Sequence, residues 1–248
     1  MIDRFKMLFD GGLSKNRIER LSLNPNLTEE QIDIIYETEG ANKNLLAEHP
    51  KLTDEQFTRF FNDTEVNKNN FASNLNLTTE QIDILYKTKG VDKDYLAQYP
   101  KLTDKQFMQA FNDGKTDKEY LAHNRNLTTE QIDLLYQTED EQSVIKNTLA
   151  TFPKLTDEQF TRFFTNADVN KNYLARNSNL TTKQIDLLYK TRGVKKNNLA
   201  ECSKLTEEQF LRFFKEGKTN IDSLAQNPSI NPETVADNYP TGVINWKW

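Results

Sequence analysis

A Leu-Thr pair recurs every 25 residues along most of this 248-residue chain, and no other feature constrains the fold as strongly. The spacing changes once, to 28 residues between Leu127 and Leu155. A period of this length is typical of stacked structural units, so we expect a repeat protein without a single central core. The pairs begin at Leu27, Leu52, Leu77, Leu102, Leu127, Leu155, Leu180 and Leu205, with Ile230-Asn231 as a degenerate ninth copy.

A second period of 50 residues overlies the first, because two unit types alternate. One type has Asn-Leu-Thr-x-x-Gln-Ile-Asp and begins at Asn26, Asn76, Asn126 and Asn179. The other has Lys-Leu-Thr-x-x-Gln-Phe and begins at Lys51, Lys101, Lys154 and Lys204. Duplication of a two-unit block explains this alternation.

Each unit opens with the signals of a short helix. Thr28 fits an N-cap, and Gln31 has the spacing of a capping box. Ile32 and the apolar residues after it share one face at helical spacing. Gly40 follows where a residue with positive φ is needed. We therefore predict a helix over about residues 29–38 and over the equivalent residues of each unit.

A second, shorter helix of ~7 residues should follow, either α or 3₁₀. Asn42 can cap it, and its Leu46-Ala47 pair has a counterpart in each later unit. Isolated helices shorter than ~12 residues are marginal, so burial must be shared between neighbouring units. The predicted fold is an all-α solenoid of about nine 25-residue two-helix repeats with a 50-residue superperiod.

We expect one solenoid domain over residues 1–248, with an N-terminal capping unit over 1–26 and repeats over 27–230. An insertion near 139–143 is either a tolerated loop or an acidic contact loop or bend. Residues 231–248 should form a helix over about 232–238 and a capping tail with Trp246 and Trp248. These tryptophans cover the last repeat or dock on a partner.

The strings Leu46-Ala47-Glu48-His49-Pro50 and Leu224-Ala225-Gln226-Asn227-Pro228 resemble the leucine-rich variant repeat. That family implies a right-handed superhelix of paired α and 3₁₀ helices. The chain differs in having Thr at the helix start instead of Pro and in lacking a cysteine-rich N-terminal cluster, so no iron–sulfur cofactor is expected. HEAT-like and other short helical repeats are the alternatives.

Composition narrows the function classes. One Cys and two His leave little for a metal site or a catalytic triad, and we expect no cofactor and no enzyme activity. No apolar run approaches the ~18 residues of a membrane span, and no secretory segment opens the sequence, so we expect a cytoplasmic protein without membrane contact. No small-molecule substrate is evident.

Seven successive units have a lysine at the same position, at the start of the second helix. We call a position that is equivalent in successive units a column, and this one the lysine column. Such a ladder could follow a nucleic-acid backbone or an acidic protein surface, although the net charge of −5 disfavours tight nucleic-acid binding. The alternative is a solvated ridge inherited by duplication. The column consists of Lys43, Lys68, Lys93, Lys118, Lys146, Lys171 and Lys196.

Three other columns are expected to be structural. Capping accounts for the unbroken glutamine column of the first helices. Asp33 and its counterparts should pair with Arg59, Arg162 and Arg212 of neighbouring units. The column that holds His49 and Cys202 varies too much to suggest a site.

We therefore expect a non-enzymatic scaffold that binds a macromolecule, most plausibly a protein, along one extended face. Nucleic-acid binding through the lysine ladder is the alternative. The Asn-rich composition with only 8 Gly is typical of low-GC genomes, which suggests a phage or mobile-element protein that sequesters a host factor.

Overall fold

The computed structural model describes residues 2–74, 76–99, 101–138, 142–202, 204–217, 219–225 and 227–238. Every regular element in these ranges is helical and none is a strand, which confirms the all-α class. None of the helices in these ranges has both the length and the apolar character needed to cross a bilayer.

The chain falls into two compact units, Met1–Asn124 and Arg125–Trp248. The expectation of one domain over 1–248 stays a prediction. The first unit contains α1 (Ile2–Asp10), α2 (Lys15–Ser22), α3 (Glu29–Glu37), α4 (Lys43–Ala47), α5 (Asp54–Asn62), η1 (Lys68–Ser73), α6 (Thr79–Lys87), α7 (Lys93–Ala97), α8 (Asp104–Asn112) and α9 (Lys118–Ala122). The second contains α10 (Thr129–Tyr136), α11 (Gln142–Ala150), α12 (Asp157–Thr165), α13 (Lys171–Leu174), α14 (Thr182–Lys190), α15 (Asn197–Ala200), α16 (Glu207–Glu216), α17 (Ile221–Ala225) and α18 (Pro232–Asn238).

The first helix of each repeat begins as the sequence predicts. In α3 the Thr28 side chain accepts a hydrogen bond from the Gln31 backbone, and the Gln31 side chain accepts one from the Thr28 backbone. This capping box satisfies two N–H groups that a helix start leaves without intrahelical partners. The same box opens α5, α6, α8, α10, α12, α14 and α16.

The second helices are shorter than expected, with four to six residues in all but α11, and η1 is a 3₁₀ helix. The insertion is also different from a simple loop, because residues 142–150 form the nine-residue helix α11. Ile145 and Leu149 are four residues apart and both buried, which supports the additional helical turn. Residues 139–141, with the acidic part of the insertion, lie outside the described residues.

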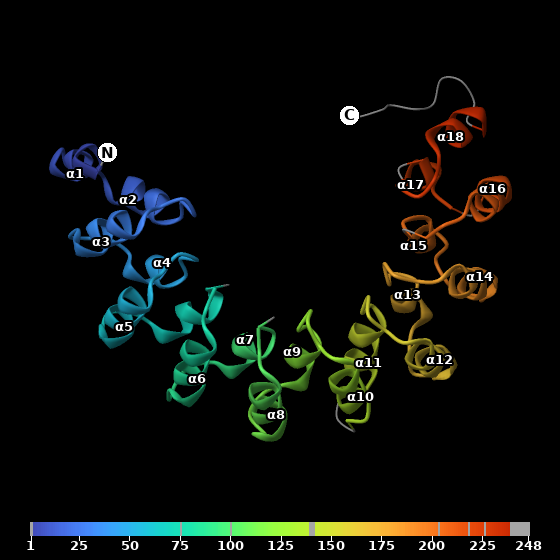
Figure 1. Ribbon diagram of the computed structural model, residues 1–248, viewed down its shortest axis with the longest axis horizontal. Coiled ribbons are helices and arrows are strands. Elements are labelled where there is room, and N and C mark those ends of the chain that lie inside the picture. The colour runs from blue at the N-terminus through green and yellow to red at the C-terminus, as the bar shows by residue number, and fades with distance from the viewer. Residues whose placement is uncertain are drawn as a thin grey trace. The chain divides into compact units, whose positions relative to one another are not determined.

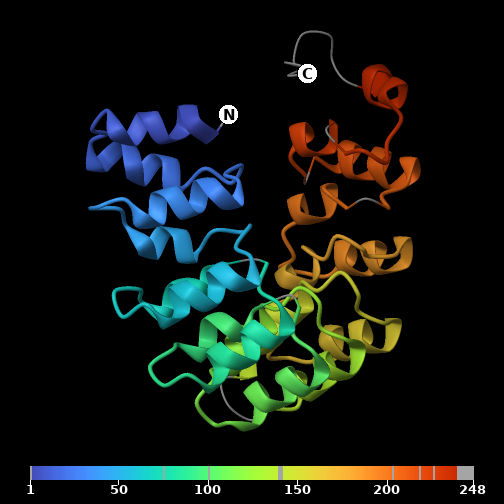
Figure 2. The same ribbon diagram turned by 60° about the vertical axis from the view of Figure 1, so that its left-hand side comes forward.

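Within residues 1–124 the helices form two layers (Figure 1). The first helices α3, α5, α6 and α8 make one row, and the second helices α4, η1, α7 and α9 make the other. The principal contacts join helices of the same or the adjacent repeat, as between α4 and η1 or between α7 and α9. Figure 2 shows from another side how each helix follows its neighbour within this unit. The core is therefore a strip between the two rows.

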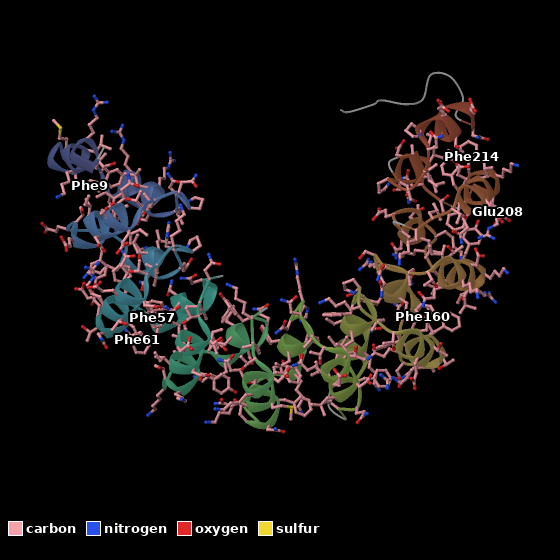
Figure 3. All side chains as sticks on the ribbon, viewed as in Figure 1. Phe9, Phe57, Phe61, Phe160, Glu208 and Phe214 are labelled. Carbon is pink, nitrogen blue, oxygen red and sulfur yellow. The ribbon has the colours of Figure 1, made fainter. Side chains whose placement is uncertain are left out.

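That strip is made of the apolar residues that the sequence repeats. Ile32 and Ile35 of α3 and the Leu46-Ala47 pair of α4 are fully buried. In α5, Phe57 and Phe61 are stacked with ring centroids 5.7 Å apart, and Figure 3 labels both together with Phe160, the equivalent of Phe57 in α12. Sharing these side chains between neighbours explains how a chain with 36% hydrophobic residues can be ordered.

A buried polar column, which we call the ladder, joins successive repeats at the end of each second helix. Asn74 donates to the carbonyl of His49 (2.8 Å), Tyr99 donates to the carbonyl of Asn74 (2.7 Å), and Asn124 donates to the carbonyl of Tyr99 (2.7 Å). Each bond spans 25 residues. Asn177 and Asn227 make the same bond in the second unit, to the carbonyls of Phe152 and Cys202.

The two ends of the described chain match the expected helices in part. Phe5 and Phe9 of α1 pack on the core, but Leu8, which fits the same helix face in the sequence, is 49% exposed. α18 covers the predicted 232–238. Its cap is Asn231, whose side chain accepts from the Glu233 backbone.

Candidate functional site

The seven lysines of the predicted column do not form an exposed ridge, since all are half-buried or buried. Lys93 donates from Nζ to the carbonyls of Leu85 and Thr88, both at 2.9 Å. These carbonyls lie at the C-terminus of α6, where a helix has unpaired acceptors and a partial negative charge. The lysine therefore starts the second helix but stabilises the end of the first.

Three other lysines of the column also bind main-chain carbonyls. Lys68 and Lys171 donate to main-chain carbonyls of the turn before their own helices, and Lys196 donates to Leu188 and Thr191. Burial lowers the pKa of Lys68, Lys93 and Lys171. All of the column except Lys171 also place Nζ 4.9–5.6 Å from the centre of an aromatic ring of the preceding helix. The charges are thus directed into the fold.

Lys43 differs because it pairs with carboxylates. Its Nζ lies 2.9 Å from Asp63 and 2.6 Å from Glu65, and hydrogen bonds to Glu65 and Asp63 raise the pKa of Lys43. Asp63 also accepts a 2.5 Å hydrogen bond from the Tyr36 hydroxyl. Burial together with this bond raises the pKa of Tyr36 to about 12, while Tyr36 and Lys43 hold the pKa of Asp63 far below its usual value.

A second polar cluster joins the first helices, where the expected ion pairs are found. Arg59 pairs with Asp33 of the preceding repeat, as do Arg162 with Asp133 and Arg212 with Asp186. Gln56 donates to the same Asp33 (2.7 Å) and to the Glu29 carbonyl (2.9 Å), so capping explains only part of the glutamine column. This cluster lines a hollow of about 590 Å³ between α3 and α5. Its polar groups bind one another, which is typical of a structural joint.

A third feature lies on the second helices α7 and α9, and it was not predicted from the sequence. Tyr95 of α7 and Tyr120 of α9 are 50% and 37% exposed, at equivalent positions of neighbouring helices. Four carboxylates surround them, and we call these six residues the acidic tyrosine patch: Asp92, Asp94, Tyr95, Asp117, Glu119 and Tyr120. A hollow of about 320 Å³ opens beside Tyr120, lined also by Gln98 and His123.

The helix caps position these carboxylates. Asp92 and Asp117 are N-caps, and each accepts from the backbone N–H two residues later. Asp94 accepts from the Asp117 backbone N–H at 2.8 Å, which fixes α7 against α9. Burial raises the pKa of Asp94, as do the neighbouring charges of Asp92 and Asp117. Like charges are therefore held close together in this patch.

The sequence signal for the patch is the change from Asn to Asp at the cap position of the second helices. Asn42 and Asn67 make the same cap bond at the positions of Asp92 and Asp117. Asn69 accepts from the Asp92 backbone just as Asp94 accepts from that of Asp117. An amide oxygen is therefore sufficient for the fold, and the negative charge of the patch is additional.

The remaining candidates from the sequence are the two tryptophans, the single cysteine and a metal site. Trp246 and Trp248 lie outside the described residues. Cys202 is buried, and burial raises the pKa of its thiol to about 12. In the described part of the chain, no three His, Cys, Asp or Glu side chains are grouped as a metal site.

Comparisons with known proteins find no match to a family model, a curated protein or a solved structure.

Proposed function

We propose that the chain is a right-handed α-helical solenoid of about nine repeats that binds another protein along the exposed side of its second helices. We call this side the second-helix face. Two features support the solenoid: nearest-neighbour contacts between repeats and the 25-residue step of the ladder. A scaffold of this kind offers an extended surface on which side chains can change without disturbing the core.

The observation that carries the proposal is where the repeats differ from one another. On the first helices, one exposed position holds only Glu or Lys: Glu30, Glu55, Glu80, Lys105, Glu130, Glu158, Lys183 and Glu208, the last labelled in Figure 3. On the second helices, one position is exposed in five repeats and holds a different side chain in each, whereas the equivalent Glu48 and Thr151 are half-buried. The five exposed residues are Ser73, Gln98, His123, Arg176 and Glu201. A constant frame with a variable surface column is the pattern of specific recognition.

The nucleic-acid alternative depends on the lysine column, and its described members are directed into the fold or paired with carboxylates. Lys68 and Lys93 bind main-chain carbonyls, and Lys43 is paired with Asp63 and Glu65. Phosphate binding depends on cations that release counterions along the backbone. Reversing the charge of these lysines would also place carboxylates at helix C-termini, so loss of binding in such variants would reflect unfolding.

The test is selection of a random-peptide display library on the full chain, followed by hydrogen exchange of the complex. We expect one enriched sequence motif and slower exchange in the second helices. Gln98→Ser, His123→Ser and Arg176→Ser together should weaken the selected peptide, since Ser is the native residue at position 73. The matched control changes Glu80, Glu130 and Glu158 to Gln and should leave binding intact. Absence of any enriched motif, or protection confined to the first helices, would refute the proposal.

A further inference from the structure

We infer that the acidic tyrosine patch docks an arginine-bearing basic segment of a partner protein, an inference that rests on the proposed protein-binding function. The patch belongs entirely to residues 92–120, on the adjoining helices α7 and α9. It combines four carboxylates, two exposed aromatic rings and a hollow beside them.

The described residues provide no cationic side chain that pairs with the patch. No lysine or arginine of the described residues forms an ion pair with Asp92, Asp94, Asp117 or Glu119. The two column lysines of these helices are engaged elsewhere, because Lys93 binds the α6 carbonyls and Lys118 lies over the Phe111 ring. A cation from outside would therefore relieve the mutual repulsion of these carboxylates.

At the equivalent tyrosine of another repeat, a cation of the chain itself lies over the ring. Tyr173 of α13 holds the position equivalent to Tyr95 and Tyr120, two residues after the column lysine. The guanidinium of Arg176, three residues later, lies over the Tyr173 ring at 5.5 Å. At Tyr95 and Tyr120 the residue three positions later is Gln98 or His123, and no cation of the described chain lies over either ring.

This comparison identifies the ligand chemistry. The tyrosine at this position accepts a guanidinium on its face, which is the usual geometry of a cation–π contact. Carboxylates beside the ring add charge-assisted hydrogen bonds that suit the planar fork of arginine better than the compact ammonium of lysine. Tyr173 is flanked by Asn170 and Asn172 and already has its own cation, whereas the patch has the acids and lacks the cation.

The experiment measures fluorescence polarisation of a labelled short peptide of alternating Arg and Gly, titrated with the full chain at low ionic strength. Matched peptides carry Lys or uncharged citrulline in place of Arg. We expect binding in the order Arg, Lys, citrulline. The variant D94N/E119Q keeps the oxygen acceptors of the patch and should weaken Arg-peptide binding about tenfold, as should Y95N/Y120N, because Asn is native at position 70.

Two controls make the result specific to the patch. E29Q/E55Q removes the same charge from the exposed rim of the hollow between α3 and α5 and should change binding less than about twofold. Y173N removes a tyrosine that already has its own cation and should act likewise. Equal weakening by E29Q/E55Q and D94N/E119Q, equal binding of the citrulline peptide, or no binding to the wild-type chain would overturn the inference.

Failure of this inference can be told apart from failure of the proposed function. If library selection yields a motif without basic residues that protects other second helices, the scaffold function stands and the assignment of the patch falls. If selection yields no motif, the proposed function falls, and the patch with it.

Discussion

Tyr99 gives the sharpest test of the ladder, because its hydroxyl bonds two buried main-chain groups at once. It donates to the carbonyl of Asn74 and accepts from the N–H of Leu77, both at 2.7 Å. All three residues are at most 3% exposed. Tyr99→Phe removes one oxygen and keeps the ring, so it leaves one buried acceptor and one buried donor unpaired.

Each unpaired buried group costs about 1–3 kcal/mol, so we expect the loss of two partners in Tyr99→Phe to lower the free energy of unfolding by about 2–6 kcal/mol. Urea titration followed by far-ultraviolet circular dichroism measures this loss. Because a repeat array can unfold in parts, hydrogen exchange of the Leu77 amide provides a local measurement. That amide should exchange faster in the variant.

The matched control is Tyr95→Phe, which removes a hydroxyl from a ring that is half exposed and only four residues away. It should change the free energy of unfolding by less than about 0.5 kcal/mol. If Tyr99→Phe is as stable as the wild type and the Leu77 amide keeps its protection, the ladder does not hold adjacent repeats together in the way described.

Three further predictions concern other joints. Lys93→Met should lower the free energy of unfolding by about 1 kcal/mol, because it removes the hydrogen bonds to the α6 carbonyls. Lys93→Glu should lower it further, because a carboxylate then faces the C-terminus of α6. Equal urea midpoints for both variants and the wild type would contradict this prediction. Gln106→Leu should lower the free energy of unfolding by about 1–3 kcal/mol, because it removes hydrogen bonds to the Thr103 backbone and to Asp83. Thermal or urea unfolding measures this loss, and an unchanged stability would show that Gln106 does not stabilise the contact between α6 and α8. Stability should fall as the pH rises from about 10 to about 12, because unfolded tyrosine releases its proton near 10 and folded Tyr36 retains it. Tyr36→Phe should reduce this alkaline loss without abolishing it, because burial also raises the pKa of Tyr86 and Tyr189, and an unchanged pH profile would show that Tyr36 does not contribute.

The sequence predicted those features that depend on a few neighbouring residues. The spacing of Thr28 and Gln31 predicted a capping box, and the structure contains it in eight first helices. The helix over residues 232–238 was predicted equally well. These motifs are local because a helix start is determined by bonds within one turn.

The features that the sequence did not predict depend on contacts between residues of different helices or different repeats. The position of Lys93 suggested an exposed ridge at the start of the second helices, but its long side chain extends to the carbonyls of the preceding helix. Asn74 and Tyr99 appeared to be a variable column because an amide and a phenol do not look alike. Each donates a hydrogen bond to the equivalent carbonyl of the preceding repeat, 25 residues earlier. This equivalence is visible only when the repeats are aligned in the structure.

The contacts between Asp33, Gln56 and Arg59 have a consequence for how such a chain changes its length. They join a unit of the first type to one of the second, and Gln81 joins the second type to the next first type through Asp54. Loss of a single 25-residue segment would bring two units of the same type into contact, with aspartates or arginines left without counterparts. We therefore expect gain or loss of a whole 50-residue pair to preserve these contacts, and gain or loss of a single unit to break them.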